Sequence, residues 1–295
     1  MTEFDLIEAF LAPFPRGQRV IVGPGSDCAA VQPARGMRLV ATTDAVVERV
    51  HFTWLRFAPE DVGWKALAVN LSDLAAAGAR PRWFLCALGV PRGTPLALVQ
   101  RMARGMAQCA RRYRCALIGG NVSGASEWSV TITALGEAAR PLTRTGARPG
   151  DALVVVGKLG YAAAGLRPHA SFAALRAQRR PVPLVNEGIR AARFASAAID
   201  VSDGFLRDLE HLCRASRCGA LVECSALPAD DLDLALSGGE DYALLLTVPH
   251  RKLAALKRSV RCVEVGRILK DSGIQLTELG VPRPLPARKG FDHLG

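Results

Sequence analysis

The 295-residue chain lacks the features that mark secreted, membrane and zinc-binding proteins. Its acidic N-terminus has no basic start followed by a long apolar segment, and no apolar run approaches the roughly 20 residues of a membrane helix. Its eight cysteines form no Cys-x-x-Cys pair, and its five histidines show no metal-ligand spacing. We therefore expect a cytoplasmic protein with no membrane contact, whose cysteines are buried free thiols rather than disulfides or zinc ligands.

Lysine is scarce, since only six of the 38 basic residues are lysines and the others are arginines spread along the chain. The net charge of +11 raises nucleic acid as a partner, because clustered basic residues neutralise phosphates. The densest arginine groups, at 101–114 and 176–180, resemble solvated helix faces and contain no interleaved aromatic residues. The charge therefore favours attraction of anionic substrates, and we expect no nucleic-acid partner.

Composition and length favour two soluble domains with large cores, because 49% of the residues are apolar and 22% are charged. The segment 139–150 is rich in proline, glycine and basic residues and has no periodic apolar pattern, which is typical of a linker. We predict an N-terminal domain at 1–138 and a C-terminal domain at 151–295. Strand and helix patterns are mixed in both, which predicts the α+β class.

The apolar periodicity also predicts the main elements of each domain. Helices are expected at 4–12, 59–78, 95–113, 183–195, 203–217 and 249–258. Strands are expected at 19–22, 37–42, 84–90, 115–118, 128–137, 219–223, 242–248 and 261–266.

Acidic side chains interrupt apolar runs at six places. The clearest is Asp73, which follows Asn70 and Ser72 in the run KALAVNLSDLAAAGARP at 65–81. Burying a carboxylate there is unfavourable unless a cation or a set of donors compensates it. The same pattern recurs beside glycine, serine or threonine at Asp27, Asp44, Asp200, Asp203 and Asp241. Ser72 or Asp73 could begin a helix as its N-cap, which explains one such residue, whereas six favour a shared site for a polyanion and metal ions.

Several of these motifs have a structural alternative. Thr42, Thr43 and Asp44 offer hydroxyl and carboxylate oxygens that suit Mg²⁺ at the end of a strand. The glycine-rich segment 119–124 is expected to form a turn between two strands. Ser202 or Asp203 could cap the helix predicted at 203–217, although capping does not exclude metal ligation.

Nine motifs, in this order along nearly the whole chain, carry a resemblance to a known family. They are G-x-G-x-D-x-A, T-T-D, V-x-x-x-H-F, K-A-L-A-V-N-L-S-D-L-A-A-x-G-A-x-P, I-G-G, R-T-G-A-x-P-G-D, A-I-D-x-S-D-G, S-G-G-E-D-Y and a closing K-G-F-D-H. The chain resembles the thiamine-monophosphate kinase family, within the superfamily of aminoimidazole ribonucleotide synthetase and selenophosphate synthetase. The resemblance implies a two-domain PurM-like fold, with an N-terminal domain that forms a β-barrel across a homodimer and a C-terminal α/β sandwich.

The resemblance also implies an activity, namely phosphorylation of thiamine monophosphate to thiamine diphosphate by in-line transfer from ATP, assisted by several Mg²⁺ ions. Catalytic roles fall on Asp44, Asp73 and Asp203. ATP contacts fall on Gly120, Asn121, Arg144 and Ser202, and substrate contacts on His51, Glu240 and the position of Arg288. The implied metal ligands are Asp27, Thr42, Thr43, Asp44, Asp73, Asn121, Asp200 and Asp203.

Three positions depart from the family pattern. Ser26 stands where the family has an acid, Asn121 replaces an Asp that would bind metal, and Arg288 replaces an aromatic residue, usually Trp. Asn121 and Arg288 favour an alternative, a paralogue that uses the same ATP and Mg²⁺ site on another small acceptor. A second alternative, a non-catalytic nucleotide-binding or nucleic-acid-associated protein, is favoured only by the charge and the altered ligand.

Overall fold

The computed structural model describes residues 3–15 and 17–291, and their contacts divide the chain into two compact units. Unit 1 comprises the residues up to Leu74 together with Arg80–Ala139, and unit 2 comprises Ala75–Ala79 and the residues from Arg140 onward. The closing K-G-F-D-H motif includes residues 292 and 293, which lie outside the described residues. In the described part of the chain, no helix is both long and apolar enough to cross a membrane.

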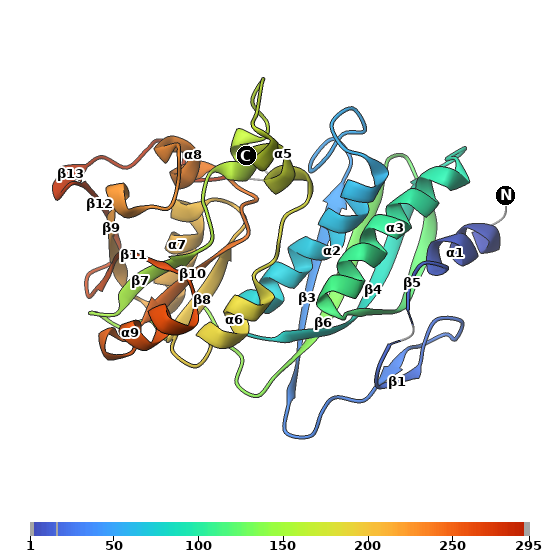
Figure 1. The fold of residues 1–295 in the computed structure, drawn as a ribbon, viewed down its shortest axis with the longest axis horizontal. Coiled ribbons are helices and arrows are strands. Elements are labelled where there is room, and N and C mark those ends of the chain that lie inside the picture. The colour runs from blue at the N-terminus through green and yellow to red at the C-terminus, as the bar shows by residue number, and fades with distance from the viewer. Residues whose placement is uncertain (1–2, 16, 292–295) are drawn as a thin grey trace. The chain divides into compact units, whose positions relative to one another are not determined.

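Unit 1 is built on a four-stranded sheet with the strand order β3-β6-β4-β5, and β1 and β2 form a separate pair (Figure 1). Strands β4 and β5 are parallel, and the other neighbours in the sheet are antiparallel. The elements of this unit are α1 (Glu3–Leu11), β1 (Val20–Val22), β2 (Ala30–Val31), β3 (Arg38–Val47), α2 (Pro59–Ala76), β4 (Arg80–Pro91), α3 (Leu96–Tyr113), β5 (Ala116–Ala125) and β6 (Ser129–Ala138).

Helices α2 and α3 pack side by side on one face of this sheet (Figure 1). Their backbones approach so closely that a Cβ added at Gly63 would lie 1.9 Å from the carbonyl oxygen of Met102. A Cβ at Gly105 would meet the carbonyl oxygen of Glu60 at the same distance, so both positions require glycine. The other face of the sheet is covered at one end by β1 and β2, through the buried side chain of Trp83.

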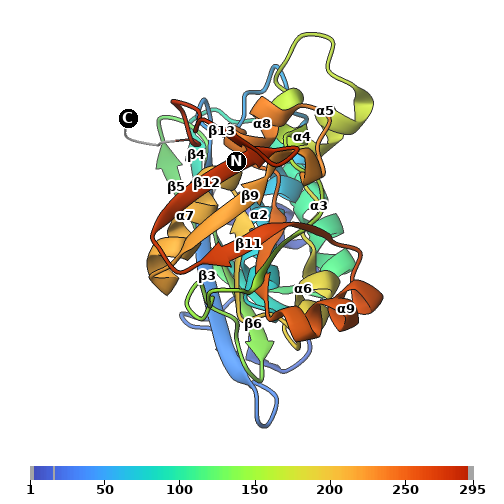
Figure 2. The ribbon, with the colours of Figure 1, turned by 90° about the vertical axis from the view of Figure 1, so that its left-hand side faces the viewer.

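Unit 2 contains a seven-stranded sheet with the order β13-β12-β9-β11-β7-β10-β8, mostly antiparallel, in which only the pair β9 and β12 is parallel among the described strands. Figure 2 shows β12, β9 and β11 side by side. The elements are β7 (Ala152–Val156), α4 (Tyr161–Ala164), α5 (Phe172–Arg179), α6 (Val185–Ala191), β8 (Ala197–Val201), α7 (Phe205–Ser216), β9 (Gly219–Glu223), a 3₁₀ turn (Cys224–Ala226), α8 (Leu232–Ser237), β10 (Ala243–Val248), α9 (His250–Ser259), β11 (Val263–Leu269), β12 (Gly273–Glu278) and β13 (Val281–Arg283).

The core of unit 2 lies between this sheet and α7. All residues of β7, β8 and β10 are buried, so both faces of these strands are covered. The apolar stripe of α7, which includes Phe205, Leu209 and Leu212, packs against alternate residues of β7 and β8. This packing fixes the loop between β8 and α7, where two of the predicted site residues lie.

All eight cysteines are free, and the prediction of buried free thiols is confirmed for most of them. Six of them are buried, Cys262 is half-buried and Cys28 is exposed. Burial raises the pKa of the Cys213 thiol to about 12, with smaller effects from Cys218 and Glu210. The buried thiols are therefore protonated and unreactive at neutral pH.

Candidate functional site

In unit 1, the structure joins Asp73 to Thr42. Helix α2 runs without a break through Ser72 and Asp73, so neither residue is a helix N-cap and that alternative is excluded. Asp73 lies half-buried in the last turn of α2, and its Oδ2 accepts a hydrogen bond of 2.5 Å from the hydroxyl of Thr42 on β3. The contact connects the edge strand of the sheet to the helix above it.

The strand places Thr42 and Asp44 on the helix-covered face of the sheet, because side chains alternate between faces. Asp44 shares its cross-strand row with the buried Ile132 of β6, which points to the same face. Thr43 points to the opposite face, where its hydroxyl donates to the carbonyl oxygen of Ile132 at 3.0 Å and accepts from the hydroxyl of Thr133 at 3.2 Å. The hydroxyl of Thr43 therefore does not join Thr42, Asp44 and Asp73.

Gly120 and Asn121 lie inside strand β5, so the prediction of a glycine turn at 119–124 is wrong. A Cβ at Gly120 would lie 2.0 Å from the carbonyl oxygen of Cys86 on β4, which explains the glycine by close strand approach rather than by a turn. Asn121 is exposed and shares its row with Ala87, Thr131 and Ala45, on the face opposite to Asp44. Three strand spacings separate β5 from β3, about 14 Å in all, so Asn121 and Asp44 do not meet within one copy of the sheet.

Asp27 and His51 occupy two further segments of unit 1. Asp27 is exposed in the loop between β1 and β2. His51 is half-buried in the turn after β3, where its Nδ1 accepts a hydrogen bond of 3.1 Å from the backbone N–H of Val47. This bond fixes the ring and leaves Nε2 as the nitrogen that carries the proton in the neutral form.

In unit 2, the loop between β8 and α7 is organised by Asp208, which is not among the residues expected in the site from the sequence. Its Oδ2 accepts three hydrogen bonds of 3.0–3.1 Å, from the backbone N–H groups of Ser202, Asp203 and Gly204. Gly204 is the N-cap of α7 and no side chain caps that helix, so neither Ser202 nor Asp203 is its cap. The carboxylate of Asp203 instead lies 4.0 Å from the Nε of Arg207 in the first turn of α7.

The pKa of Asp208 is set by effects that act in opposite directions. Burial and the nearby charge of Asp203 raise its pKa to about 7, while the three N–H groups act in the opposite direction. One feature of the sequence indicates this role of Asp208. The residue lies in the first turn of α7, four residues after Gly204, where a carboxylate can accept hydrogen bonds from the N–H groups of the preceding loop.

Two other segments of unit 2 converge on this loop. The backbone N–H of Glu240 donates to the carbonyl oxygen of Ser202 at 2.7 Å, and the N–H of Phe291 donates to that of Asp203 at 2.8 Å. A Cβ at Gly239 would lie 2.7 Å from the carbonyl oxygen of Ser202, so the contact requires glycine there. The structure thus brings together the backbone segments of Ser202, Asp203 and Glu240.

Arg288 belongs to the same C-terminal segment as Phe291. It is exposed, and its Nε donates to the carbonyl oxygen of Gly290 at 3.2 Å. Gly290 is buried against the loop, because a Cβ there would lie 2.7 Å from the carbonyl oxygen of Asp203. Arg288 is therefore two residues from a contact with the Asp203 backbone.

Asp200 and Arg144 lie beside this loop. Asp200 is 4% exposed on β8, and it points away from the α7 side because its neighbours Ile199 and Val201 face the core with α7. Arg144 is exposed, and its carbonyl oxygen accepts a hydrogen bond of 2.8 Å from Ser216 at the end of α7. Burial, followed by the charge of Arg144, lowers the pKa of His211 on α7, while Asp203 raises it, which places both charges near one helix face.

Asp241 is one of the six carboxylates singled out in the sequence, and backbone hydrogen bonds at the start of α4 explain its position. Its Oδ2 accepts a hydrogen bond of 2.6 Å from the N–H of Gly160, and its Oδ1 accepts one of 3.0 Å from Ala162. It therefore holds the start of α4. Burial raises its pKa to about 6 against the effect of these N–H groups.

Within the described residues, no group of three or more His, Cys, Asp or Glu side chains is placed to hold a metal ion by itself. Each unit instead offers one or two carboxylates with neighbouring hydroxyl oxygens, namely Asp73 with Thr42 and Asp203 with Ser202. This donor set fits Mg²⁺, which keeps waters and is usually bound through one or two carboxylates and substrate phosphates.

Known proteins are similar to this one along most of the chain. Residues 25–138 match the family model of the AIR synthase related protein N-terminal domain, and residues 148–278 match that of its C-terminal domain. The thiamine-monophosphate kinase of Haemophilus influenzae is 35% identical over 99% of this chain and 98% of that protein. The thiamine-monophosphate kinase of Salmonella typhimurium is 36% identical with the same coverage of both chains. The chain belongs to the thiamine-monophosphate kinase family.

Solved structures of this family have the same fold. The crystal structure of thiamine-monophosphate kinase from Stenotrophomonas maltophilia superposes with a TM-score of 0.84 at 33% identity, covering 96% of this chain and 98% of that chain. A structure described as AaThiL complexed with AMPPCP and TMP has a TM-score of 0.80 at 29% identity, covering 98% of this chain and 95% of that one. The expectation of a two-domain PurM-like fold of mixed helices and strands is therefore confirmed.

Proposed function

We propose that this chain transfers the γ-phosphoryl group of ATP to thiamine monophosphate, which yields thiamine diphosphate and ADP. The observation that carries the proposal is family membership over almost the full length of relatives that are named for this activity. A neighbour with the same fold was solved with an ATP analogue and TMP bound, which supports the same pair of substrates here. The carboxylates in both units are suited to holding Mg²⁺ ions for phosphoryl transfer.

In this proposal, the protein acts by positioning and by electrostatics. The acceptor phosphate is already mostly ionised at neutral pH, since its second pKa is about 6, so the reaction requires no strong general base. His51 is fixed by Val47, and Glu240 is fixed by the backbone of Ser202, so each is held in place to orient the acceptor. Arg144 is exposed and free of carboxylate hydrogen bonds among the described contacts, which suits a contact with ATP phosphates.

The residues that would hold Mg²⁺ in this proposal are carboxylates and hydroxyls. When bound, the ions would neutralise the charge that develops on the phosphoryl oxygens. Asp73 is already oriented by Thr42, so its second oxygen is free to face an ion, and Asp44 lies two residues from Thr42 on the same face of β3. The remaining proposed ligands are Asp27, Asn121, Asp200 and Asp203, whereas the hydroxyl of Thr43 is hydrogen-bonded on the opposite face of the sheet.

We also propose that two copies pair through unit 1. In one copy the four-stranded sheet is open, with β3 and β5 at its edges and exposed small or polar residues on the face away from the helices, such as Ala87 and Asn121. Unpaired strand edges favour association with another strand. Pairing of β5 with β3 of another copy would place the strand that carries Asn121 beside the strand that carries Asp44, whereas about 14 Å separates these strands within a single copy.

The test is to measure thiamine diphosphate formation by chromatography in reactions of the purified chain with ATP, Mg²⁺ and thiamine monophosphate. We expect product only when all three are present, with one ADP formed for each thiamine diphosphate. Asp44→Asn should remove most of the activity, and the exposed Asp271→Asn should not. ATP turnover without thiamine diphosphate would reject the acceptor and favour the paralogue suggested by Asn121 and Arg288.

A further inference from the structure

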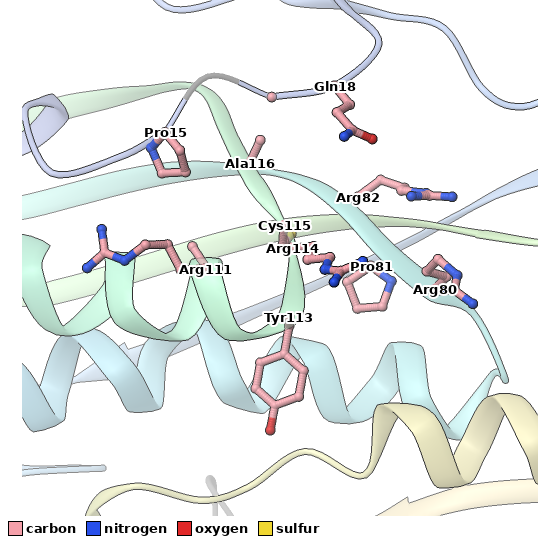
Figure 3. Close-up of a pocket in the computed structure, with 12 residues that line it drawn as sticks. Pro15, Gln18, Arg80, Pro81, Arg82, Arg111, Tyr113, Arg114, Cys115 and Ala116 are labelled. Atoms are coloured by element: carbon pink, nitrogen blue, oxygen red, sulfur yellow. The ribbon is translucent and has the colours of Figure 1, made fainter.

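An arginine-lined cavity lies in unit 1, at the starts of β4 and β5 and the end of α3 (Figure 3). Its volume is about 360 Å³, within the range of small-molecule sites. Of the twelve described residues that line it, four are arginines and none is Asp or Glu. The arginines are Arg80, Arg82, Arg111 and Arg114.

Three of these arginines face the cavity together. Figure 3 shows the guanidinium groups of Arg80, Arg82 and Arg114 on one side of the cavity, below the side-chain amide of Gln18, whereas Arg111 points the other way. The Nη1 of Arg111 donates to the carbonyl oxygen of Pro13 at 2.8 Å, which explains its direction. The Nε of Arg82 is bound to Glu137 at 2.7 Å.

The remaining positive charge is not balanced within the described part of the chain. Arg80 and Arg114 are both exposed, and their side chains have no hydrogen bond or ion pair with any described residue. Glu137 cannot neutralise the group, because it is also bound to Arg19 at 3.3 Å and accepts from the backbone N–H of Ala34. Like charges brought together without a partner repel each other, so their gathering in a cavity favours an anionic ligand.

Stabilisation of the C-terminal end of α3 does not explain why these four arginines gather at the cavity. Basic residues in the last turn of α3 interact favourably with its carbonyl groups, and this explains Arg111 and Arg112. Arg80 and Arg82, however, come from β4, where their positions are set by the strand rather than by the helix. Two elements that are far apart in the sequence therefore direct guanidinium groups to one cavity.

We propose that this cavity binds a small ligand with a phosphate or pyrophosphate group. Guanidinium groups bind phosphate oxygens through paired N–H donors, and Gln18 adds an amide donor. The volume exceeds that of a single phosphate, and the rings of Pro15 and Pro81 offer apolar contact for an organic portion. The site is separate from the proposed catalytic residues, none of which lines the cavity.

The test is calorimetric titration of the full chain with inorganic pyrophosphate in EDTA. Without Mg²⁺, the carboxylates of the proposed active site repel an anion, whereas the arginine cavity needs no metal. We expect binding by the unmodified chain and a loss of affinity of about tenfold or more in Arg80→Gln/Arg114→Gln. The control Arg92→Gln/Arg251→Gln removes the same charge from exposed positions outside the cavity, and it should change the affinity less than about twofold.

A lysine variant and a second anion test whether binding depends on guanidinium groups and on phosphate. Arg80→Lys/Arg114→Lys keeps the charge but loses the paired donors, so we expect an intermediate affinity. Citrate, a multiply charged carboxylate, should bind more weakly than pyrophosphate. The proposal is overturned if pyrophosphate does not bind, if both double Gln variants lose affinity equally, or if citrate binds as tightly. Thermal unfolding of each variant checks that the fold is retained. None of these readouts depends on thiamine monophosphate turnover.

Discussion

The buried ammonium group of Lys65 on α2 donates a hydrogen bond of 3.3 Å to the carbonyl oxygen of His51. The same ammonium lies 5.2 Å from the ring centre of Phe57, and Phe57 packs against Phe52 at 6.3 Å between ring centres. A fully buried lysine is unusual, because desolvation disfavours its charge. Lys65 therefore fixes the turn that presents His51, a proposed contact of the acceptor.

We predict that Lys65→Met raises the KM for thiamine monophosphate several-fold while kcat falls much less. Methionine fills a similar volume, so the fold should remain stable, but the turn at His51 loses its hydrogen bond. Steady-state kinetics with each substrate varied in turn measures the effect. Lys252→Met is the control, because Lys252 also donates to a backbone carbonyl, that of Arg193, in unit 2. Equal changes in the KM values for ATP and thiamine monophosphate would contradict this role.

Asp73→Asn should lower kcat by roughly 10²–10³-fold, since a lost charge near the transferred phosphoryl group typically weakens transition-state stabilisation by a few kcal/mol. The amide oxygen can still accept the hydrogen bond from Thr42, so thermal unfolding should change little. Turnover at saturating Mg²⁺ is the measurement, with the exposed Asp271→Asn as the control. Near-normal turnover would show that Asp73 has only a structural role.

Glu137→Gln should lower the free energy of unfolding by about 2 kcal/mol at pH 7, because the carboxylate is 2% exposed and bound to Arg19 and Arg82. Burial would raise the pKa of Glu137, but the Ala34 N–H and the two arginines outweigh it and lower the pKa below its ordinary value of 4.5. The stabilisation is therefore present above about pH 4.5 and is lost as the pH falls through the lowered pKa.

Urea unfolding of both forms between pH 3 and pH 8 tests this. The difference between the native chain and Glu137→Gln should be constant near neutrality and shrink in acid. As a control, Glu278→Gln removes an ion pair from an exposed carboxylate, and it should change stability by less than about 1 kcal/mol. A difference that grew in acid would show the opposite sign of the pKa shift.

Thr131→Lys should convert a dimer into a monomer and reduce activity. Thr131 lies on the face of the unit 1 sheet away from the helices, between Ala87 and Ala45 in its cross-strand row. A lysine there would bury a charge if two sheets associate. Sedimentation equilibrium measures the mass, and Gln275→Lys on the exposed side of β12 is the control. A native chain that is monomeric and fully active at micromolar concentration would refute the dimer.

Much of the fold could be predicted from apolar periodicity. Helices α2 and α3 and strand β9 lie within two residues of the predicted ranges, because long amphipathic or alternating patterns specify them strongly. Strands β12 and β13 were not predicted, since short exposed strands have no continuous apolar pattern. The glycine-rich part of β5 was misassigned because glycine there serves close strand packing, and the sequence alone does not distinguish this from a turn.

Less of the candidate site than of the fold could be predicted from the sequence. Local spacing identified Asp73 and Asp203 as anomalous, but it could not show that Asp241 turns toward Gly160 or that Asp208 organises the loop of Ser202. The N–H groups that bind Asp241 are 81 and 79 residues away in the sequence, so only tertiary structure brings them close, whereas those that bind Asp208 are 4 to 6 residues away and form a local loop. The pairing register likewise determines that Thr42 and Thr43 face opposite sides of the sheet.

Asn121→Asp tests whether this position reaches a metal ion. A hard dication gains more from an anionic oxygen than from an amide carbonyl, so the Mg²⁺ concentration for half-maximal activity should fall. Because Asn121 is exposed on edge strand β5, the change should leave thermal unfolding unaltered.

Ser123→Asp adds the same charge two residues along the same face of β5 and serves as the control. If Mg²⁺ titration of turnover shows no shift for Asn121→Asp, or the same shift for both variants, Asn121 is not a metal ligand. If the Mg²⁺ requirement falls only for Asn121→Asp, position 121 on edge strand β5 contributes to a metal site, which supports the proposed ligand role of Asn121.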